Sequence, residues 1–508
     1  FQQILLFAPL LTYFGKRSLI AYDEGFYTLQ AKWILENNNW IAPLWWGNIS
    51  LDRTIGIQYC LAISQKLFGE NNIGYIFPIT LAGIIMVIGT YHLHKELVGD
   101  DFAIISPIIL STTFLWINYV NMATQDLIFA SIITIGLLSS IKSVKHDSNI
   151  YFLFSGLWIG LAVMMKTYLT ILPLIGIFPF LLNSKTFKKK FYWLGIIIGF
   201  TPFLIWSTNI INVYDFDTFL GLHRKLLFLT KNNNFTNPFY YYLWNIPLNI
   251  FPWSIFAIIG IIKSKNLKDK YANYFLFKYP LIIIILLSIF STKTPYYPLQ
   301  ILSLISINTY LGIITIFKEN KKLFIYIKKF LFIFIPIIIF ILSALVLKNN
   351  INIDIANYQK QIISFGLICF SISWFIINFT NSLKRKILFI TLGSYILTVF
   401  IVQSGLITDK SKELRLAGEK LVQNEFLKNE KIEVIKNDLG DERSVSKIIK
   451  IFLLMPKIGN GIESLENLSK NQYVWTTTNK NKILNNNKYL LINESEIFSP
   501  WKLIKRVD

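Results

Sequence analysis

Two acidic residues stand out because each lies at the edge of an apolar segment. Asp23 belongs to Tyr22-Asp23-Glu24-Gly25-Phe26-Tyr27, ahead of a predicted helix, and Asp126 directly precedes an apolar run. An acid within a membrane span costs about 2.5–3.5 kcal/mol on insertion scales, so it usually faces a cavity and has a partner. Both aspartates could instead only cap their helices, with Glu24 favouring the helix dipole. Because they belong to different elements on one predicted side of the membrane, they could also converge.

Three basic residues are predicted on that same side. Arg53 lies in the outer loop 16–73, Lys166 in a tight turn between two spans, and Lys293 begins the turn Lys293-Thr294-Pro295-Tyr296-Tyr297. Each lysine could simply extend from a helix end to the interface. Together with a carboxylate base they would suit a phosphate-bearing lipid. The guanidinium of arginine can donate two parallel hydrogen bonds to phosphate oxygens, and lysines act as point charges.

The composition predicts a membrane protein, so these side chains would be positioned by membrane-spanning helices. Of the 508 residues, 53% are apolar and 16% charged, and the mean hydropathy is +0.48. Soluble domains average about 25% charged residues, which excludes one large soluble domain. Segments of about 20 apolar residues predict roughly thirteen spans. They lie near 1–15, 74–92, 102–118, 126–141, 150–165, 168–183, 192–208, 243–262, 279–292, 298–316, 330–347, 361–379 and 386–404.

The net charge of +21 records topology and does not predict a nucleic-acid partner. Basic residues gather between apolar runs, for example at Lys188-Lys189-Lys190 and Lys384-Arg385-Lys386. The positive-inside rule then places the loops 16–73 and 209–242 and the segment after residue 404 on the outer side.

Two domains are predicted. Residues 1–404 would form the membrane domain, in which the loop 16–73 carries amphipathic helices that lie in the interface, with Leu29 and Trp33 on the apolar side of the first. Residues 405–508 contain no run long enough to cross a bilayer, and their short apolar stretches alternate with polar helical segments. We expect a small soluble α/β domain there.

Weaker candidates for contact with a substrate lie beside these residues. They are Asp52, Tyr27, His223, Arg224 and Tyr241. A lone histidine such as His223 is more often structural than a ligand. The chain has no phosphate-binding glycine loop, no His-Glu-x-x-His and no paired Cys-x-x-Cys. No cofactor is therefore expected, and a metal site is unknown.

The motifs resemble those of the GT-C superfamily, polytopic glycosyltransferases that use polyprenyl-phosphate sugars. The nearest branch holds the protein O-mannosyltransferases and the 4-amino-4-deoxy-L-arabinose lipid A transferases. Residues 22–27 resemble the family's Asp-Glu-x-x-Tyr motif, and Asp126 matches its second acidic position. Further segments follow the family pattern, namely Trp40-Ile-Ala-Pro43, Leu67-Phe68-Gly69-Glu70-Asn71, Gly160 to Lys166, Asn237 to Tyr242 with Phe251-Pro252-Trp253, and Lys293 to Tyr297.

Two positions depart from the pattern. The family's usual Glu-Lys-Pro-Pro appears as Asp52-Arg53-Thr54-Ile55, which keeps both charges but neither proline. Thr167 follows Lys166 where the family commonly has glycine. A divalent metal suggested for some relatives cannot be assigned, because His223 does not align securely.

The resemblance implies an inverting transfer of a sugar from undecaprenyl phosphate to a lipid, glycan or protein acceptor, at the outer face of a bacterial inner membrane. Asp23 would accept the acceptor's proton, and Glu24 in the same motif is a further catalytic candidate. Asp126 would help to orient the acceptor or the basic residues. Arg53, Lys166, Lys293 and Tyr297 would hold the departing phosphate. The aminoarabinose enzymes are the closest match, and a protein O-mannosyltransferase is the alternative. The expected partners are the donor, the acceptor and membrane lipids, with the chain as a monomer.

Two other classes stay open. A transporter or flippase for lipid-linked sugars would also bind phosphate, but it should show internal repeats and acids near mid-membrane. A non-catalytic membrane scaffold would tolerate the loss of Asp23 and Asp126 together.

Overall fold

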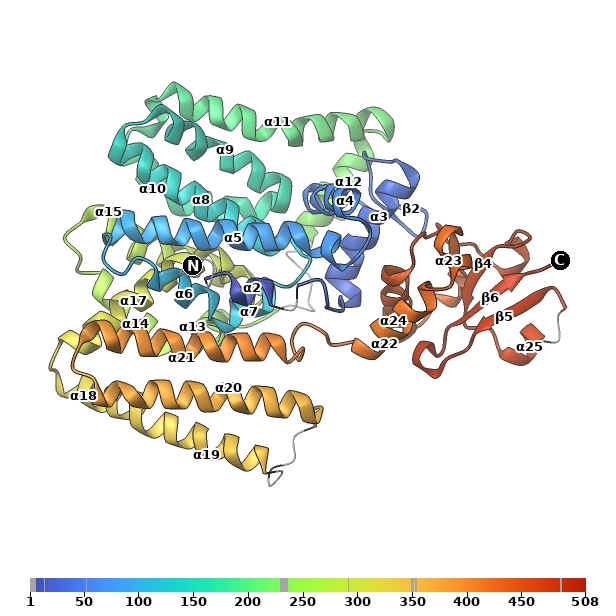
Figure 1. Ribbon diagram of the computed structural model, residues 1–508. Coiled ribbons are helices and arrows are strands. Elements are labelled where there is room, and N and C mark those ends of the chain that lie inside the picture. The colour runs from blue at the N-terminus through green and yellow to red at the C-terminus, as the bar shows by residue number, and fades with distance from the viewer. Residues whose placement is uncertain are drawn as a thin grey trace. The chain divides into compact units, whose positions relative to one another are not determined.

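A computed structural model describes residues 6–12, 14–51, 53–228, 236–290, 292–348, 351, 354–484 and 487–508 (Figure 1). The chain forms two compact units. The helical unit comprises Phe1–Tyr13, Ile79–Asn121 and Gln125–Ile407, and the mixed unit comprises Phe14–Pro78, Met122–Thr124 and Thr408–Asp508. The first predicted loop thus belongs to the same unit as the C-terminal segment, whereas the sequence assigned it to the membrane domain.

The helical unit consists of helices, most of them apolar along their whole length. In chain order they are α2 (Ala8–Leu11), α6 (Ile105–Ser111), α7 (Phe114–Tyr119), α8 (Gln125–His146), α9 (Asn149–Lys166), α10 (Ile171–Asn183), α11 (Lys190–Val213), α12 (Phe216–Phe228), α13 (Tyr241–Asn249), α14 (Ser254–Ser264), α15 (Lys270–Asn273), α16 (Tyr279–Ile289), α17 (Leu302–Lys318), α18 (Lys322–Lys329), α19 (Ile335–Leu347), α20 (Asn357–Ile376) and α21 (Leu383–Gln403). Helix α5 (Asn72–Leu97) begins in the mixed unit and continues into this one.

Within the described residues, nine helices are long and apolar enough to cross a membrane, or ten if the pair α13 and α14, bent by 117°, forms one span. The run Asn149–Asn183 counts once among them, although α9 and α10 are separated at Thr167, whose φ is 39°. The predicted span 102–118 is divided into α6 and α7, each too short to cross alone. The polytopic helical class is confirmed, and the number thirteen stays a prediction.

Glycine allows a close backbone contact between α9 and α11 in this unit. A Cβ atom on Gly160 would lie 2.1 Å from the carbonyl carbon of Gly199, and one on Gly195 would lie 2.0 Å from the Leu153 oxygen. Such small residues let helix backbones approach in an apolar solvent, where packing replaces the hydrophobic effect as the driving force. This contact fixes α9, which ends at Lys166.

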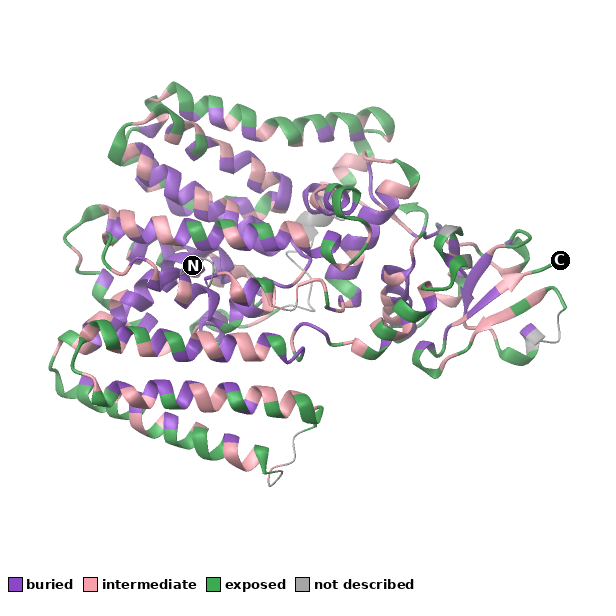
Figure 2. Cartoon of the chain, viewed as in Figure 1, coloured by how far each residue is buried: buried purple, intermediate pink, exposed green. Residues whose placement is uncertain are grey.

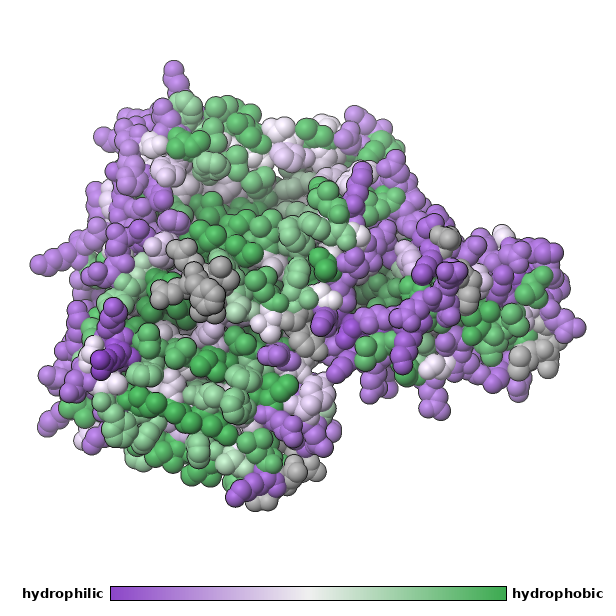
Figure 3. Space-filling view, viewed as in Figure 1, coloured by the Kyte–Doolittle hydropathy of each residue, from purple (hydrophilic) through white to green (hydrophobic). Residues whose placement is uncertain are grey.

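The outer surface of the helical unit is apolar, as expected for a protein surrounded by lipid. Figure 3 shows hydrophobic side chains spread over its helices, and Figure 2 shows many exposed positions on α11 and α19. Ile197, Leu204 and Ile205 on α11 are among these exposed large side chains. An apolar face of this extent would be an aggregation hazard in water.

The mixed unit combines helices with a small sheet. Its elements are η1 (Ala21–Gly25), α3 (Phe26–Asn37), β1 (Leu44–Trp45), β2 (Asn48–Ile49), α4 (Gly56–Phe68), α22 (Lys412–Val422), α23 (Glu425–Asn429), β3 (Ile432–Val434), α24 (Glu442–Leu454), β4 (Tyr473–Thr476), α25 (Lys480–Leu484), β5 (Tyr489–Asn493) and β6 (Lys502–Arg506). The four-stranded sheet has the order β3-β4-β6-β5, with β3 and β4 parallel and the other pairs antiparallel.

The expectation that the first helix of the loop lies in the membrane interface is wrong for α3. Every residue from Tyr27 to Ile34 is buried, because the C-terminal segment covers the polar side as well. The Lys32 ammonium donates to the carbonyl of Met455, and the Trp33 indole N–H donates to that of Gly459 at 2.9 Å. Helix α4 instead has an exposed apolar side, formed by Ile63, Leu67 and Phe68.

Candidate active site

Asp126 and Lys166 form a buried ion pair inside the helical unit. Asp126 stands in the first turn of α8 and Lys166 is the last residue of α9, so each charge also suits its helix dipole. The ammonium donates to Oδ1 of the carboxylate, and the two side chains are only 5% and 9% exposed. The pairing follows from topology, because the start of one helix meets the end of the next when the two pack antiparallel.

Aromatic rings enclose the ammonium of Lys166. Its Nζ lies 5.1 Å from the ring centre of Tyr296, 5.3 Å from that of Tyr297 and 5.7 Å from that of Phe129. These distances are within the range of cation–π attraction, which stabilises a cation with little water around it. Tyr297 was predicted here, but Tyr296 was missed as a site residue, since the sequence does not say which of two adjacent tyrosines faces a lysine.

Lys293 is fixed by backbone carbonyls of the same unit. Its side chain is buried, and Nζ donates to the carbonyl oxygens of Asn237 at 2.9 Å and of Phe290 at 2.5 Å. The Tyr242 hydroxyl donates to the carbonyl of Thr294 at 3.1 Å, which holds the following turn. Burial lowers the pKa of Lys293. Within the described residues, two of the three ammonium N–H groups have acceptors, so a third can donate to a ligand.

The weaker candidates of the helical unit have local partners. The hydroxyl oxygen of Tyr241 accepts a hydrogen bond from the Asn245 amide at 3.1 Å. Nδ1 of His223 lies 2.7 Å from the Tyr168 hydroxyl, two residues after Lys166. The side chain of Arg224 lies outside the described residues. These contacts favour structural roles for Tyr241 and His223.

Asp23 occupies a strained turn of the mixed unit. Its φ and ψ are 57° and −79° inside η1, a conformation that a non-glycine residue rarely adopts, and its side chain is exposed. Gly25, not Asp23, stands at the N-cap of α3, so the alternative of Asp23 as a helix cap is wrong. Strain of about 1–3 kcal/mol in such conformations is typically retained at functional positions.

The buried carboxylate of Glu24 stabilises this turn through hydrogen bonds. Its carboxylate, 1% exposed, accepts hydrogen bonds from Arg17 Nη2 at 2.6 Å, from the Ile20 N–H at 3.0 Å and from the Ala123 N–H at 2.8 Å. The burial favours a positioning role for Glu24 over the catalytic one predicted from the motif. Burial also lowers the pKa of Arg17. Arg17 was missed, because nothing in the sequence links it to Glu24.

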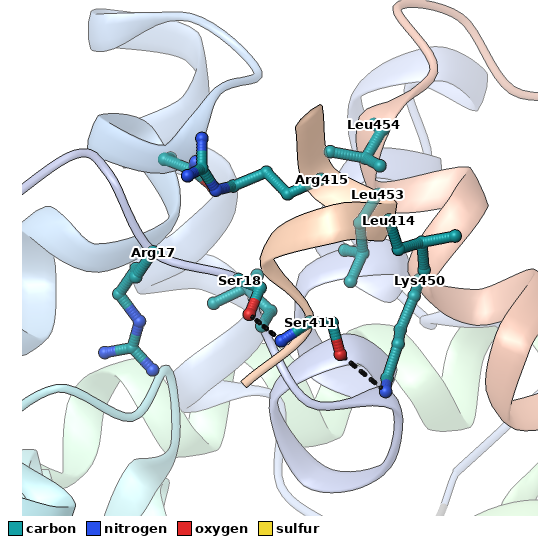
Figure 4. A pocket seen from close by; sticks show the side chains of 10 residues that line it. Arg17, Ser18, Ser411, Leu414, Arg415, Lys450, Leu453 and Leu454 are labelled. Atoms are coloured by element: carbon teal, nitrogen blue, oxygen red, sulfur yellow. Dashed lines mark hydrogen bonds between the residues drawn. The ribbon is translucent and has the colours of Figure 1, made fainter. Parts of the chain in front are cut away.

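The C-terminal segment supports the same turn. The Tyr22 hydroxyl donates to the Glu442 carbonyl at 3.1 Å, and a Cβ on Gly25 would lie 2.6 Å from Cγ2 of Ile449. Figure 4 shows a neighbouring pocket, where the Ser411 N–H donates to Ser18 Oγ at 2.8 Å and Lys450 donates to Ser411 Oγ at 2.9 Å. The end of the chain therefore helps to position the Asp23 turn.

The Glu24 carboxylate should matter more for stability than for chemistry. The substitution Glu24→Gln removes the carboxylate that is hydrogen-bonded to the buried Arg17 guanidinium, and removing one partner of a buried pair costs about 3–5 kcal/mol. We expect a markedly lower melting temperature of the purified protein. Glu419→Gln is the matched control, because that carboxylate also pairs with an arginine, Arg415, but is 45% exposed. Equal melting temperatures for the two variants would contradict the anchoring role.

Arg53 stacks on Tyr27 in the mixed unit. Its guanidinium carbon lies 4.8 Å from the ring centre of Tyr27, which is itself fully buried and so acts as a platform. This stacking keeps the planar fork in one orientation. Asp52, predicted beside it, lies outside the described residues.

The candidate residues thus form two sets. Asp23, Arg53 and Tyr27 belong to the mixed unit, and the cluster around Lys166 belongs to the helical unit. Their convergence on one substrate stays a prediction. Among the residues that the structure describes, no group of three or more His, Cys, Asp or Glu side chains could hold a metal ion.

Residues 52–206 match the family model of dolichyl-phosphate-mannose-protein mannosyltransferases. A protein of Aquifex aeolicus is 25% identical over 311 residues, which cover 58% of this chain and 60% of the relative. The undecaprenyl phosphate-alpha-4-amino-4-deoxy-L-arabinose arabinosyl transferase of Edwardsiella ictaluri is 23% identical over 289 residues, covering 54% and 52%. The chain thus spans little more than half the length of these two relatives.

The fold is similar to that of ArnT from Cupriavidus metallidurans bound to undecaprenyl phosphate. The TM-score is 0.76 at 12% sequence identity, and the match covers 100% of this chain and 97% of the other. At this identity the likeness concerns the fold, and it agrees with the sequence matches. The chain is thus similar to the aminoarabinose transferases and the protein mannosyltransferases, in sequence over part of its length and, for the first group, in fold over all of it.

Proposed function

We propose that this chain is a membrane glycosyltransferase that takes a sugar from a polyprenyl phosphate, with undecaprenyl phosphate as the carrier. The sugar passes with inversion to a hydroxyl of a lipid, glycan or protein at the outer face of a bacterial inner membrane. The relatives named for aminoarabinose transfer support undecaprenyl phosphate as the carrier, and the motif resemblance to the lipid A transferases makes a lipid the first candidate acceptor. The mannosyltransferase family model supports a protein acceptor as the second candidate.

The observation that carries the proposal is the buried Lys166. A cation held between one carboxylate and two tyrosine rings has lost most of its water and keeps a fixed position. Such a charge stabilises an anion far more than a solvated lysine does, because it need not reorganise during the reaction. A phosphate leaving group develops negative charge in the transition state. The role proposed for Lys166 is to stabilise that charge.

In the proposed reaction the acceptor oxygen attacks the anomeric carbon as the bond from that carbon to the phosphate oxygen breaks. The electron pair of the broken bond stays on the polyprenyl phosphate, which Lys166, Lys293 and Arg53 would neutralise. The acceptor proton moves to the Asp23 carboxylate. Attack opposite the leaving phosphate inverts the configuration at the anomeric carbon.

The substitution Lys166→Met should weaken binding of the carrier. We expect the purified protein to bind undecaprenyl phosphate at least tenfold more tightly than undecaprenol in native mass spectrometry, and Lys166→Met to remove most of that preference. Lys189→Met is the control, because its ammonium pairs with Asp147 in an exposed position. Equal binding of phosphate and alcohol would contradict the proposal and favour a scaffold. Carrier binding without any sugar transfer would favour a flippase.

A further inference from the structure

A groove of about 580 Å³ opens in the mixed unit, and none of the residues assigned to the reaction lines it. It lies between the C-terminal ends of α3 and α4. The side chains used below are Leu35, Asn38, Trp40, Gln65, Lys66 and Glu70. Two of the segments that follow the GT-C pattern, Trp40-Ile-Ala-Pro43 and Leu67-Phe68-Gly69-Glu70-Asn71, meet here, and the proposed reaction uses neither.

Trp40 gives the groove a fixed aromatic wall. The Tyr59 hydroxyl donates to the Trp40 carbonyl, and the two rings pack with centres 5.9 Å apart. The indole N–H donates to the Asn38 side-chain oxygen at 3.2 Å. The ring is therefore held in place with its polar edge satisfied, and what it offers to a ligand is its flat apolar face.

Gln65 contributes a buried acceptor. The residue is 1% exposed, its amide nitrogen donates to the Thr28 carbonyl at 3.3 Å, and its Oε1 accepts no hydrogen bond within the described part of the chain. A buried acceptor without a donor is destabilising, so such atoms in native proteins usually meet water or a ligand. A hydroxyl donor on a ligand would satisfy this oxygen.

Glu70 adds a carboxylate that cannot move away. Nζ of the fully buried Lys32 lies 3.1 Å from its Oε2, while the side chain as a whole is 26% exposed. The exposed side of the carboxylate accepts hydrogen bonds and repels anions. Lys66, at the exposed margin of the groove, can donate to a hydroxyl or carbonyl.

We propose that this groove binds a saccharide, with one sugar ring stacked on Trp40 and its hydroxyls donating to Gln65 and Glu70. A flat apolar face bordered by fixed acceptors fits a ring that is apolar on its faces and carries hydroxyl donors at its edge. A purely apolar ligand would leave Gln65 unpaired, and a phosphate would face Glu70. With the proposed function as its basis, the saccharide is the part of the acceptor that docks before transfer.

Saturation-transfer NMR on the full chain in phospholipid nanodiscs, free of glycoside detergents, tests this groove. The probes are chitobiose and maltose, each as the free disaccharide and as a hexyl glycoside, with inorganic phosphate as the negative probe. We expect at least one disaccharide to bind. Binding of both forms indicates a free glycan, and binding of the hexyl form alone indicates a glycolipid.

Trp40→Ala should weaken that binding at least tenfold, and Trp193→Ala, at an exposed tryptophan of α11, should not change it. If Trp40→Ala lowers the melting temperature, Gln65→Met is the deciding variant, because it keeps the side-chain volume and removes the acceptor oxygen together with the amide's hydrogen bond to the Thr28 carbonyl. No disaccharide binding at millimolar concentration, or equal affinity in both groove variants and the wild type, overturns the proposal.

The groove and the reaction can fail separately. Asp23→Asn should lose sugar transfer and keep disaccharide binding. If a disaccharide binds through Trp40 while the wild type transfers no sugar, saccharide binding in the groove is supported and the proposed function is refuted. If the wild type transfers sugar and no disaccharide binds, the proposed function is supported and saccharide binding in the groove is refuted.

Discussion

Asp23→Asn should abolish sugar transfer while the protein stays folded and inserted. The change removes the only proton acceptor assigned to the reaction, and general-base assistance is worth about 10²–10⁴-fold in rate. Folding should survive because the side chain is exposed and asparagine tolerates a positive φ as aspartate does. The measurement is the initial rate of sugar transfer from the lipid-linked donor by the reconstituted protein, beside its melting temperature.

Asp147→Asn is the matched control for that experiment. Asp147 also has a positive φ, of 43°, and an exposed side chain, but it pairs with Lys189 away from the candidate residues. Its rate should equal that of the wild type. Unchanged turnover in Asp23→Asn would remove Asp23 from the mechanism and leave its strained turn without a catalytic explanation.

The second large effect is expected at the Asp126–Lys166 pair. Lys166→Met should reduce transfer at least a hundredfold, because the cation that stabilises the leaving phosphate is lost. It should also destabilise the protein by about 3–5 kcal/mol, since Asp126 would be buried without a partner. Transfer rates and melting temperatures of the purified variants measure the two effects.

The double variant Asp126→Leu, Lys166→Met separates chemistry from stability. Replacing both members of a buried pair by apolar residues of similar size is often neutral for folding. We therefore expect the melting temperature to recover while transfer stays lost. Recovery of both would mean that the pair only holds α8 against α9, and the phosphate would then need another cation.

The sequence was sufficient to predict candidate residues that lie at the ends of apolar segments. Asp126 begins one span and Lys166 ends the next, so hydropathy alone placed both at the same edge of the helical unit. The aromatic enclosure could not be predicted, because the position of Tyr296 depends on how its turn folds over α9.

Contacts between distant segments were the main gap. The sequence could not show that residues after 404 cover α3, because no local sequence pattern predicts a contact between segments about 400 residues apart. The sequence also could not distinguish Asp23 in a strained turn from Asp23 as a helix cap. The strain depends on Glu24 and its buried partner Arg17, and on Tyr22 with its contact to Glu442.

Mass spectrometry of lipid-linked and envelope glycans tests the central claim most directly. Cells lacking this protein would be compared with cells that carry the wild type or Asp23→Asn at equal abundance in the membrane. The account predicts that one undecaprenyl-phosphate sugar accumulates, and that one envelope lipid, glycan or protein loses a sugar of the same mass, both without the protein and with Asp23→Asn. Identical glycan profiles with and without the protein would contradict it.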